Sequence, residues 1–95
     1  PHFEQAATMQ FLSLKQTEEL LDMAVNYNHT AVIDYYFGNR SRSDIHRIKP
    51  IRIERTRGTP YVEAHHIFED DVRSFKIANI KAIRIVYDDE ENEEL

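Results

Sequence analysis

The sequence contains no cysteine and no tryptophan, and it has only two glycines and three prolines among its 95 residues. Without cysteine the chain forms no disulfide bond and offers no thiolate ligand to a metal, which fits a reducing compartment. No apolar run approaches the roughly 18 residues of a membrane-spanning helix. No basic segment followed by an apolar one opens the chain, as a secretory signal would. We therefore expect a cytoplasmic protein that does not enter a membrane.

The length and composition indicate one small domain with a single modest core. Hydrophobic residues form 41% of the chain, which suffices for folding, and charged residues form 31%, slightly above the usual share. We divide the sequence into an N-terminal arm over residues 1–12, a folded domain over 13–87 and an acidic tail over 88–95.

Charge is segregated along the chain. The net charge is −5, but the tail carries six carboxylates, so the rest of the chain has a net charge of +1. Residues 40–57 hold seven Lys or Arg residues against two carboxylates, a net charge of +5. Such a segment attracts anionic ligands.

One helix is predicted between Ser13 and Asn28. Ser13 and Gln16 have the spacing of a capping box, and Thr17 offers a second helix start. Asn28 suits a left-handed C-terminal cap. The apolar stripe of this helix consists of Leu20, Leu21, Ala24 and Val25.

From Thr30 the apolar residues alternate, which predicts strands. We expect one strand from Thr30 to the break at Gly38, followed by strands over residues 45–55, 61–68, 72–77 and 80–87. A bulge is expected at Pro50 and a turn at Gly58. One helix and five strands favour a mainly β fold whose sheet closes into a small barrel, because closure removes exposed edges. The predicted core comprises Leu20, Leu21, Val25, Ile33, Tyr35, Ile53, Phe75, Ile80 and Ile83.

Four basic residues are the first candidates for a ligand site. Arg47 and Lys49 share one side of the second predicted strand, and Arg40 and Arg42 lie in the loop before it. Arginine binds phosphate through a planar fork of donors. The alternative is an ordinary solvated strand face.

Tyr61 and Arg73 complete the candidate site. Tyr61 can stack on a nucleobase, or it can be a half-buried tyrosine of the barrel wall. Arg73 shares a strand face with Phe75, so it belongs near the barrel rim if Phe75 is in the core. Its alternative partner is the acidic turn at residues 69–71.

Metal binding and catalysis find little support in the sequence. His65 and His66 are adjacent on a strand and point in opposite directions, which makes them a poor chelating pair. No Ser-His-Asp order, glycine-rich phosphate loop or positioned carboxylate pair is present. We expect no enzymatic activity, no metal and no cofactor.

The order of several short motifs resembles the WYL domain, a ligand-binding module of bacterial regulators. The residues in its characteristic places are Ile33-Asp34-Tyr35, Arg47 to Pro50, Pro60-Tyr61-Val62, Arg73-Ser74-Phe75 and Asn79-Ile80. Pro60, Val62 and Asn79 stand where the family has tryptophan, leucine and a second arginine. The resemblance covers Thr17 to Val86 and implies an Sm-like, SH3-like barrel with a leading helix.

The resemblance implies a ligand-sensing or regulatory module within a larger transcription regulator or nucleic-acid-processing enzyme. Its expected ligand is single-stranded nucleic acid or a nucleotide, bound by the basic and aromatic residues named above. The alternative is a protein-interaction module without a nucleotide ligand, in which attached or partner domains dock on the barrel edge and the helix.

Overall fold

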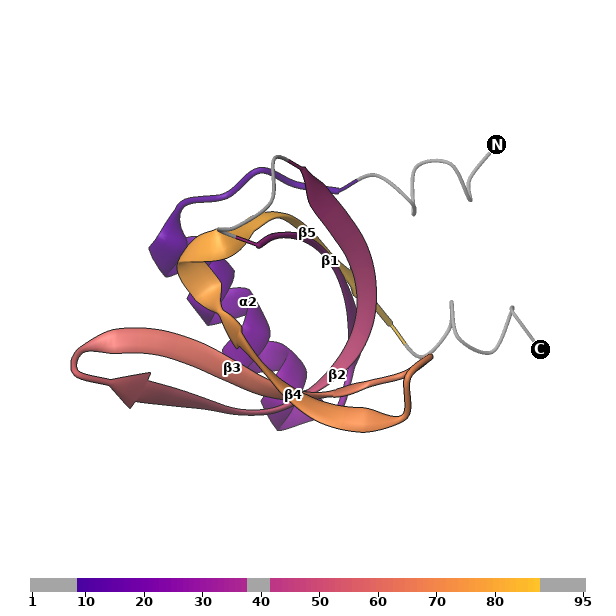
Figure 1. Ribbon diagram of the computed structural model, residues 1–95. Coiled ribbons are helices and arrows are strands. Elements are labelled where there is room, and N and C mark those ends of the chain that lie inside the picture. The colour runs from indigo at the N-terminus through magenta and orange to yellow at the C-terminus, as the bar shows by residue number, and fades with distance from the viewer. Residues whose placement is uncertain (1–8, 38–41, 88–95) are drawn as a thin grey trace.

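The computed structural model describes residues 9–37 and 42–87. One α-helix precedes a five-stranded antiparallel sheet that curves around the core (Figure 1). The elements are α2 (Leu14–Tyr27), β1 (Thr30–Tyr36), β2 (Ser43–Thr56), β3 (Thr59–His66), β4 (Asp71–Lys76), η1 (Ile77–Asn79) and β5 (Ile80–Val86). The predicted fold class, a helix followed by five strands, is confirmed.

Helix α2 begins and ends as its capping residues predict. The Ser13 hydroxyl accepts a hydrogen bond from the Gln16 backbone N–H at 3.2 Å, and the Ser13 N–H donates to the Gln16 side chain at 3.1 Å. Asn28 ends the helix with φ 59°. The capping box therefore fixes the start at Ser13, while the alternative start, Thr17, is buried inside the helix. No helix in the described ranges is long and apolar enough to cross a membrane.

The strands lie in the order β4-β3-β2-β1-β5. β4 and β5 are the edges, and no ladder joins them within residues 9–37 and 42–87, so barrel closure stays a prediction. Part of the N-terminal arm supports the β5 edge, because Gln10 and Ile83 exchange backbone hydrogen bonds at 2.9 and 3.0 Å.

Two local features shape the long strand β2. Its register with β3 shifts between Pro50 and Arg52, so Ile51 is an extra residue and the strand bends there, as expected for a proline in a sheet. The hairpin that follows turns at Arg57 and Gly58, both with positive φ, which matches the right-handed twist of the flanking strands.

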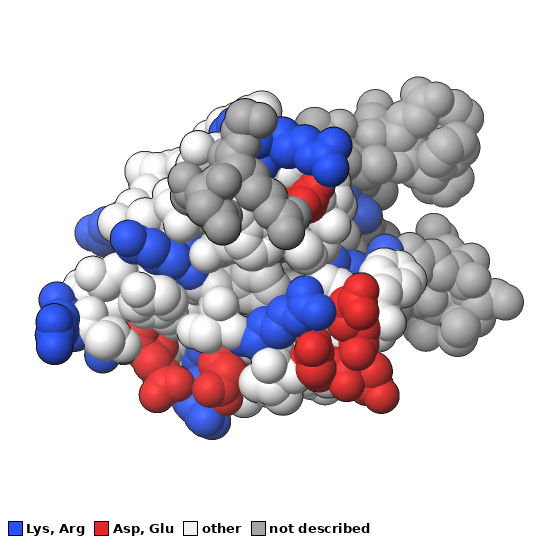
Figure 2. Space-filling model, in the orientation of Figure 1, with Lys and Arg blue, Asp and Glu red and all other residues white. Residues whose placement is uncertain are grey.

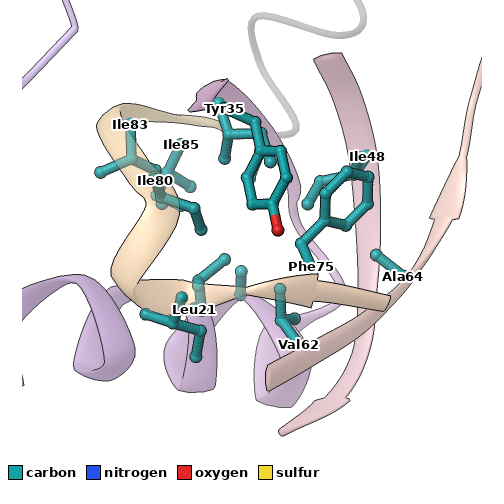
Figure 3. Packing of buried hydrophobic residues seen from close by; sticks show 13 residues of the cluster. Leu21, Tyr35, Ile48, Val62, Ala64, Phe75, Ile80, Ile83 and Ile85 are labelled. Atoms are coloured by element: carbon teal, nitrogen blue, oxygen red, sulfur yellow. The ribbon is translucent and has the colours of Figure 1, made fainter. Parts of the chain in front are cut away.

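The core lies between the inner face of the sheet and α2 (Figure 3). Six predicted core residues are buried: Leu21, Ile33, Tyr35, Phe75, Ile80 and Ile83. Leu20, Val25 and Ile53 are partly buried, and Leu20 and Ile53 pack against the core. Leu20 and Ile53 lie at the margin of the core, where each lines a groove beside α2.

Tyr35 joins β1 to the free edge of β4. Its hydroxyl accepts a hydrogen bond from the Lys76 backbone N–H at 2.9 Å. Its ring makes edge-to-face contacts with Phe37 and Phe75, each at 5.0 Å between ring centroids. Figure 3 shows the Tyr35 side chain pointing into the core toward Phe75. The hydroxyl therefore links β1 to a backbone donor of the edge strand β4.

Candidate functional site

Strand alternation places Arg47 and Lys49 side by side on the outer face of β2. The residue between them, Ile48, is fully buried, so the two cations point away from the core. They are two residues apart, about 7 Å along the strand. Val32 on β1 lies directly opposite Arg47, and His65 on β3 lies directly opposite Lys49. The predicted pairing of these two cations on one face is confirmed.

Two other cations of the basic segment form ion pairs. Arg52 forms an ion pair with Glu63 at 2.6 Å, and Arg55 reaches Glu18 of α2 at 2.5 Å. These pairs tie the β2–β3 hairpin together and fasten it to the helix. Two of the seven cations of this segment therefore have a structural use.

The loop before β2 was also predicted to contribute cations. Arg42 is exposed immediately before the strand. Arg40 lies outside the described residues.

Tyr61 lies on the outer face but away from Arg47 and Lys49. It stands opposite Glu54 on β2 and Lys76 on β4, and it is half-buried. It is four positions along β3 from His65, the partner of Lys49, which corresponds to about 13 Å. The structure therefore does not bring Tyr61 into contact with these two cations.

Arg73 lies on the opposite face from Arg47 and Lys49. It shares the inner side of β4 with Phe75 and stands opposite the buried Ala64. Its guanidinium contacts Asp71 at 2.9 Å, and it remains partly exposed. The ion pair with the acidic turn, which the sequence offered as the alternative to a ligand role, is observed. Among the described candidates, Arg47, Lys49 and Tyr61 therefore lie on the outer face, and Arg73 lies on the inner one.

Next to Arg73, the sequence analysis missed a pair of hydrogen-bonded histidines. His46 Nδ1 and His66 Nε2 are 2.9 Å apart, and His66 Nδ1 accepts from the Glu69 backbone N–H at 3.1 Å. Because His66 Nδ1 is an acceptor, a neutral His66 carries its proton on Nε2 and donates it to His46. His46 Nδ1 is then an acceptor, and His46 carries its proton on Nε2. Only the pairing of β2 with β3 reveals this contact, because the two residues are twenty apart in the chain.

This arrangement favours the neutral form of His46 and disfavours a metal. Burial, His66 and Arg73 lower the pKa of His46, and Asp44 opposes that shift. A histidine that binds a metal normally donates from its other ring nitrogen, whereas the second nitrogen of His66 is occupied as an acceptor. No group of three potential metal ligands occurs within the described part of the chain.

His65, the neighbour of His66, points the other way, as predicted, and pairs with Asp70 at 2.8 Å.

Charge is unevenly spread over the surface. On the face shown in Figure 2, carboxylates gather mainly in the lower half, and the charged side chains of the upper half are mostly cations.

Comparison with known proteins gives a matching family and similar solved structures. The family model of the WYL domain matches residues 16–85. Proteasome accessory factor B/C (PafBC) of Arthrobacter aurescens has a similar structure, with a TM-score of 0.72 and 18% sequence identity over 84% of this chain. This chain spans only 13% of the PafBC chain. No curated protein sequence matches. At this identity the structural likeness shows the fold, and the family model shows the relationship: the chain belongs to the WYL domain family.

Proposed function

We propose that this chain is a non-catalytic regulatory module that binds single-stranded nucleic acid through the outer face of β2. The observation that carries the proposal is the position of Arg47 and Lys49 on one outward face, opposite the uncharged Val32 and opposite His65. A ligand on this face meets two cations within about 7 Å. Arginine binds a phosphate through its planar guanidinium, which has a fork of hydrogen-bond donors, and lysine binds a phosphate through its compact ammonium charge.

The setting of the domain supports a regulatory use. The matching region of PafBC is a small part of a longer chain, so a ligand on this domain can alter the output of domains attached to it. We infer a transcription regulator or a nucleic-acid-processing enzyme as the larger protein.

Salt dependence of binding tests the proposal. Fluorescence anisotropy with a labelled single-stranded oligonucleotide should show affinity falling with salt, by about 0.7 in log–log slope for each neutralised phosphate. Arg47→Ala and Lys49→Ala should each flatten this slope by about that amount. Arg57→Ala, at the tip of the β2–β3 hairpin, is the matched control and should leave the slope unchanged. Unchanged binding by the folded Arg47 and Lys49 variants would contradict the proposal.

A groove beside α2 favours a second candidate function, docking of a protein segment. The groove has a volume of about 700 Å³ and is lined by Lys15, Glu18, Glu19, Asp22, Ile53 and Arg55. Three carboxylates around one half-buried isoleucine suit a cationic segment with an apolar side chain. Loss of partner binding on Asp22→Lys, without any effect of Arg47→Ala, would favour this candidate.

A further inference from the structure

β4 is an edge strand whose only ladder in the described part of the chain is with β3 (Figure 1). Backbone groups of successive residues in an antiparallel strand point alternately toward one neighbouring strand and the other. The Lys76 N–H points away from β3, because it donates to the Tyr35 hydroxyl at 2.9 Å. The N–H and C=O groups of Val72 and Ser74 therefore also point away from β3, and both residues are exposed.

Three neighbouring side chains make this edge complementary to itself. Asp71 and Arg73 flank Val72 on the inner face, where they contact each other at 2.9 Å. Val72 lies on the outer face and is 57% exposed. When two identical strands pair antiparallel with Val72 at the centre, Asp71 of each copy lies directly opposite Arg73 of the other. Opposite charges in such cross-strand positions attract each other, and the two valines form an apolar pair.

The other registers of such a pair contain conflicts. A pair centred on Arg73 places the two guanidinium groups directly opposite each other, and like charges in these positions repel. A pair centred on Ser74 sets Val72 of one copy against Lys76 of the other, whose N–H already donates to Tyr35. A shift by one residue sets outward backbone groups of one copy against groups of the other that face β3, so no ladder forms. The register centred on Val72 avoids all three conflicts.

We infer that β4 is a self-association edge, on which a second copy of this chain pairs antiparallel about Val72. The pair has two-fold symmetry, so each copy contributes the same surface. The Val72 N–H of each copy donates to the Val72 C=O of the other, and an Asp71–Arg73 pair between the copies lies on each side of these bonds. The assembly stops at two copies, because pairing uses the β4 edge while Gln10 supports the opposite edge of the sheet at Ile83.

The small size of this interface sets its strength. One strand edge buries less than the surface of about 1,000 Å² that a stable interface needs, so the isolated chain should pair with a dissociation constant on the order of 0.1–1 mM. This chain matches only 13% of the PafBC chain. When other domains of such a longer chain hold two copies together, their high effective concentration favours a weak contact. The β4 edge therefore fits a contact between domains within an existing assembly.

Complementary charge variants of the complete chain test the inference. The Asp71→Arg variant carries two cations beside Val72, and the Arg73→Asp variant carries two carboxylates. Each variant alone places like charges opposite each other, so its self-association should weaken about 10-fold. An equimolar mixture restores both opposite-charge pairs and should associate as the unmodified chain does. Neither variant retains the contact between residues 71 and 73 within one copy, so that contact cannot explain a recovery in the mixture.

Sedimentation equilibrium and amide chemical shifts of the labelled chain measure this association over concentrations that bracket the expected constant. The amide signals of Val72 and Ser74 should shift with concentration in the unmodified chain. Val72→Lys leaves the inner face unchanged and places two cations opposite each other on the outer face, so it should weaken association as well. The control is Lys81→Asp on β5, which changes the net charge as Arg73→Asp does and should associate normally. Circular dichroism checks that each variant is folded.

Three results would overturn the inference. The first is an unmodified chain that stays monomeric over the whole range. The second is association that persists in the folded Asp71→Arg, Arg73→Asp and Val72→Lys variants, because the contact would then lie elsewhere. The third is a mixture of the two folded charge variants that stays monomeric. None of these results depends on Arg47 or Lys49, so oligonucleotide binding is judged separately.

Discussion

Removal of one oxygen atom from Tyr35 should destabilise the whole domain. The hydroxyl is the hydrogen-bond partner of the Lys76 backbone N–H at the free edge of β4. Tyr35→Phe keeps the ring and its contacts with Phe37 and Phe75 but leaves the backbone donor without this acceptor. Loss of a hydrogen bond that leaves a shielded group unsatisfied costs about 1–3 kcal/mol. Because Lys76 is itself half-buried and water can partly replace the hydroxyl, we expect about 1–2 kcal/mol.

Urea unfolding followed by circular dichroism measures this difference as a change in midpoint at constant m-value. The matched control is Tyr36→Phe, one residue further along β1. Tyr36 points away from the core, and its ring contact with Lys81 at 5.8 Å does not need the hydroxyl. We expect that control to change the free energy of unfolding by less than about 0.5 kcal/mol. If the two substitutions have equal effects, Tyr35 does not fasten β1 to the edge of β4.

Three further predictions concern the core, the histidine pair and the tail. Ile33→Ala should lower the unfolding free energy by about 2–5 kcal/mol, because Ile33 is fully buried. Val32→Ala on the outer face is the control. Equal losses in the two variants would show that the strand faces are misassigned. The lowered pKa of His46 means that the unfolded chain binds a proton more readily than the folded one, so stability should be complete above about pH 6.5 and should fall as the pH drops toward the folded pKa. For one proton, the unfolding free energy can change by at most about 1.4 kcal/mol per pH unit, and partial exposure of His46 reduces this value. Urea unfolding at several pH values should show a weaker pH dependence of stability in His46→Gln. An unchanged pH dependence would exclude His46 as its source. Deletion of residues 88–95 should leave the melting temperature unchanged and raise oligonucleotide affinity at fixed salt, because six carboxylates are removed; a lower affinity would contradict this competition.

The fold was predictable because local signals agree with one another along the chain. The helix is bounded by residues that cap its backbone, namely Ser13 and Gln16 at its start and Asn28 at its end. The bulge follows Pro50, and the turn contains Gly58 with its positive φ. The half-buried state of Leu20 and Ile53 was not predictable, since the apolar period does not show where the sheet ends and the grooves beside α2 begin. The closure of the sheet likewise depends on long-range geometry.

The site was predictable only within a strand. Alternation placed Arg47 and Lys49 on one face, and it placed Arg73 with Phe75 on another. Contacts between strands depend on register, which a single sequence specifies weakly when bulges shift it. The His46–His66 hydrogen bond comes from register, and for this reason the structure was needed to find it.

The most direct test of the account is the map of backbone amide and arginine Nε–H chemical shift changes when a single-stranded oligonucleotide is added to the labelled protein. A ligand on the outer face should shift the signals of Val32, Arg47 and Lys49 together and leave those of Glu19 and Asp22 in the α2 groove unchanged. Shifts confined to that groove, or the absence of any shift at saturating oligonucleotide, would contradict the proposal that this domain binds nucleic acid through β2.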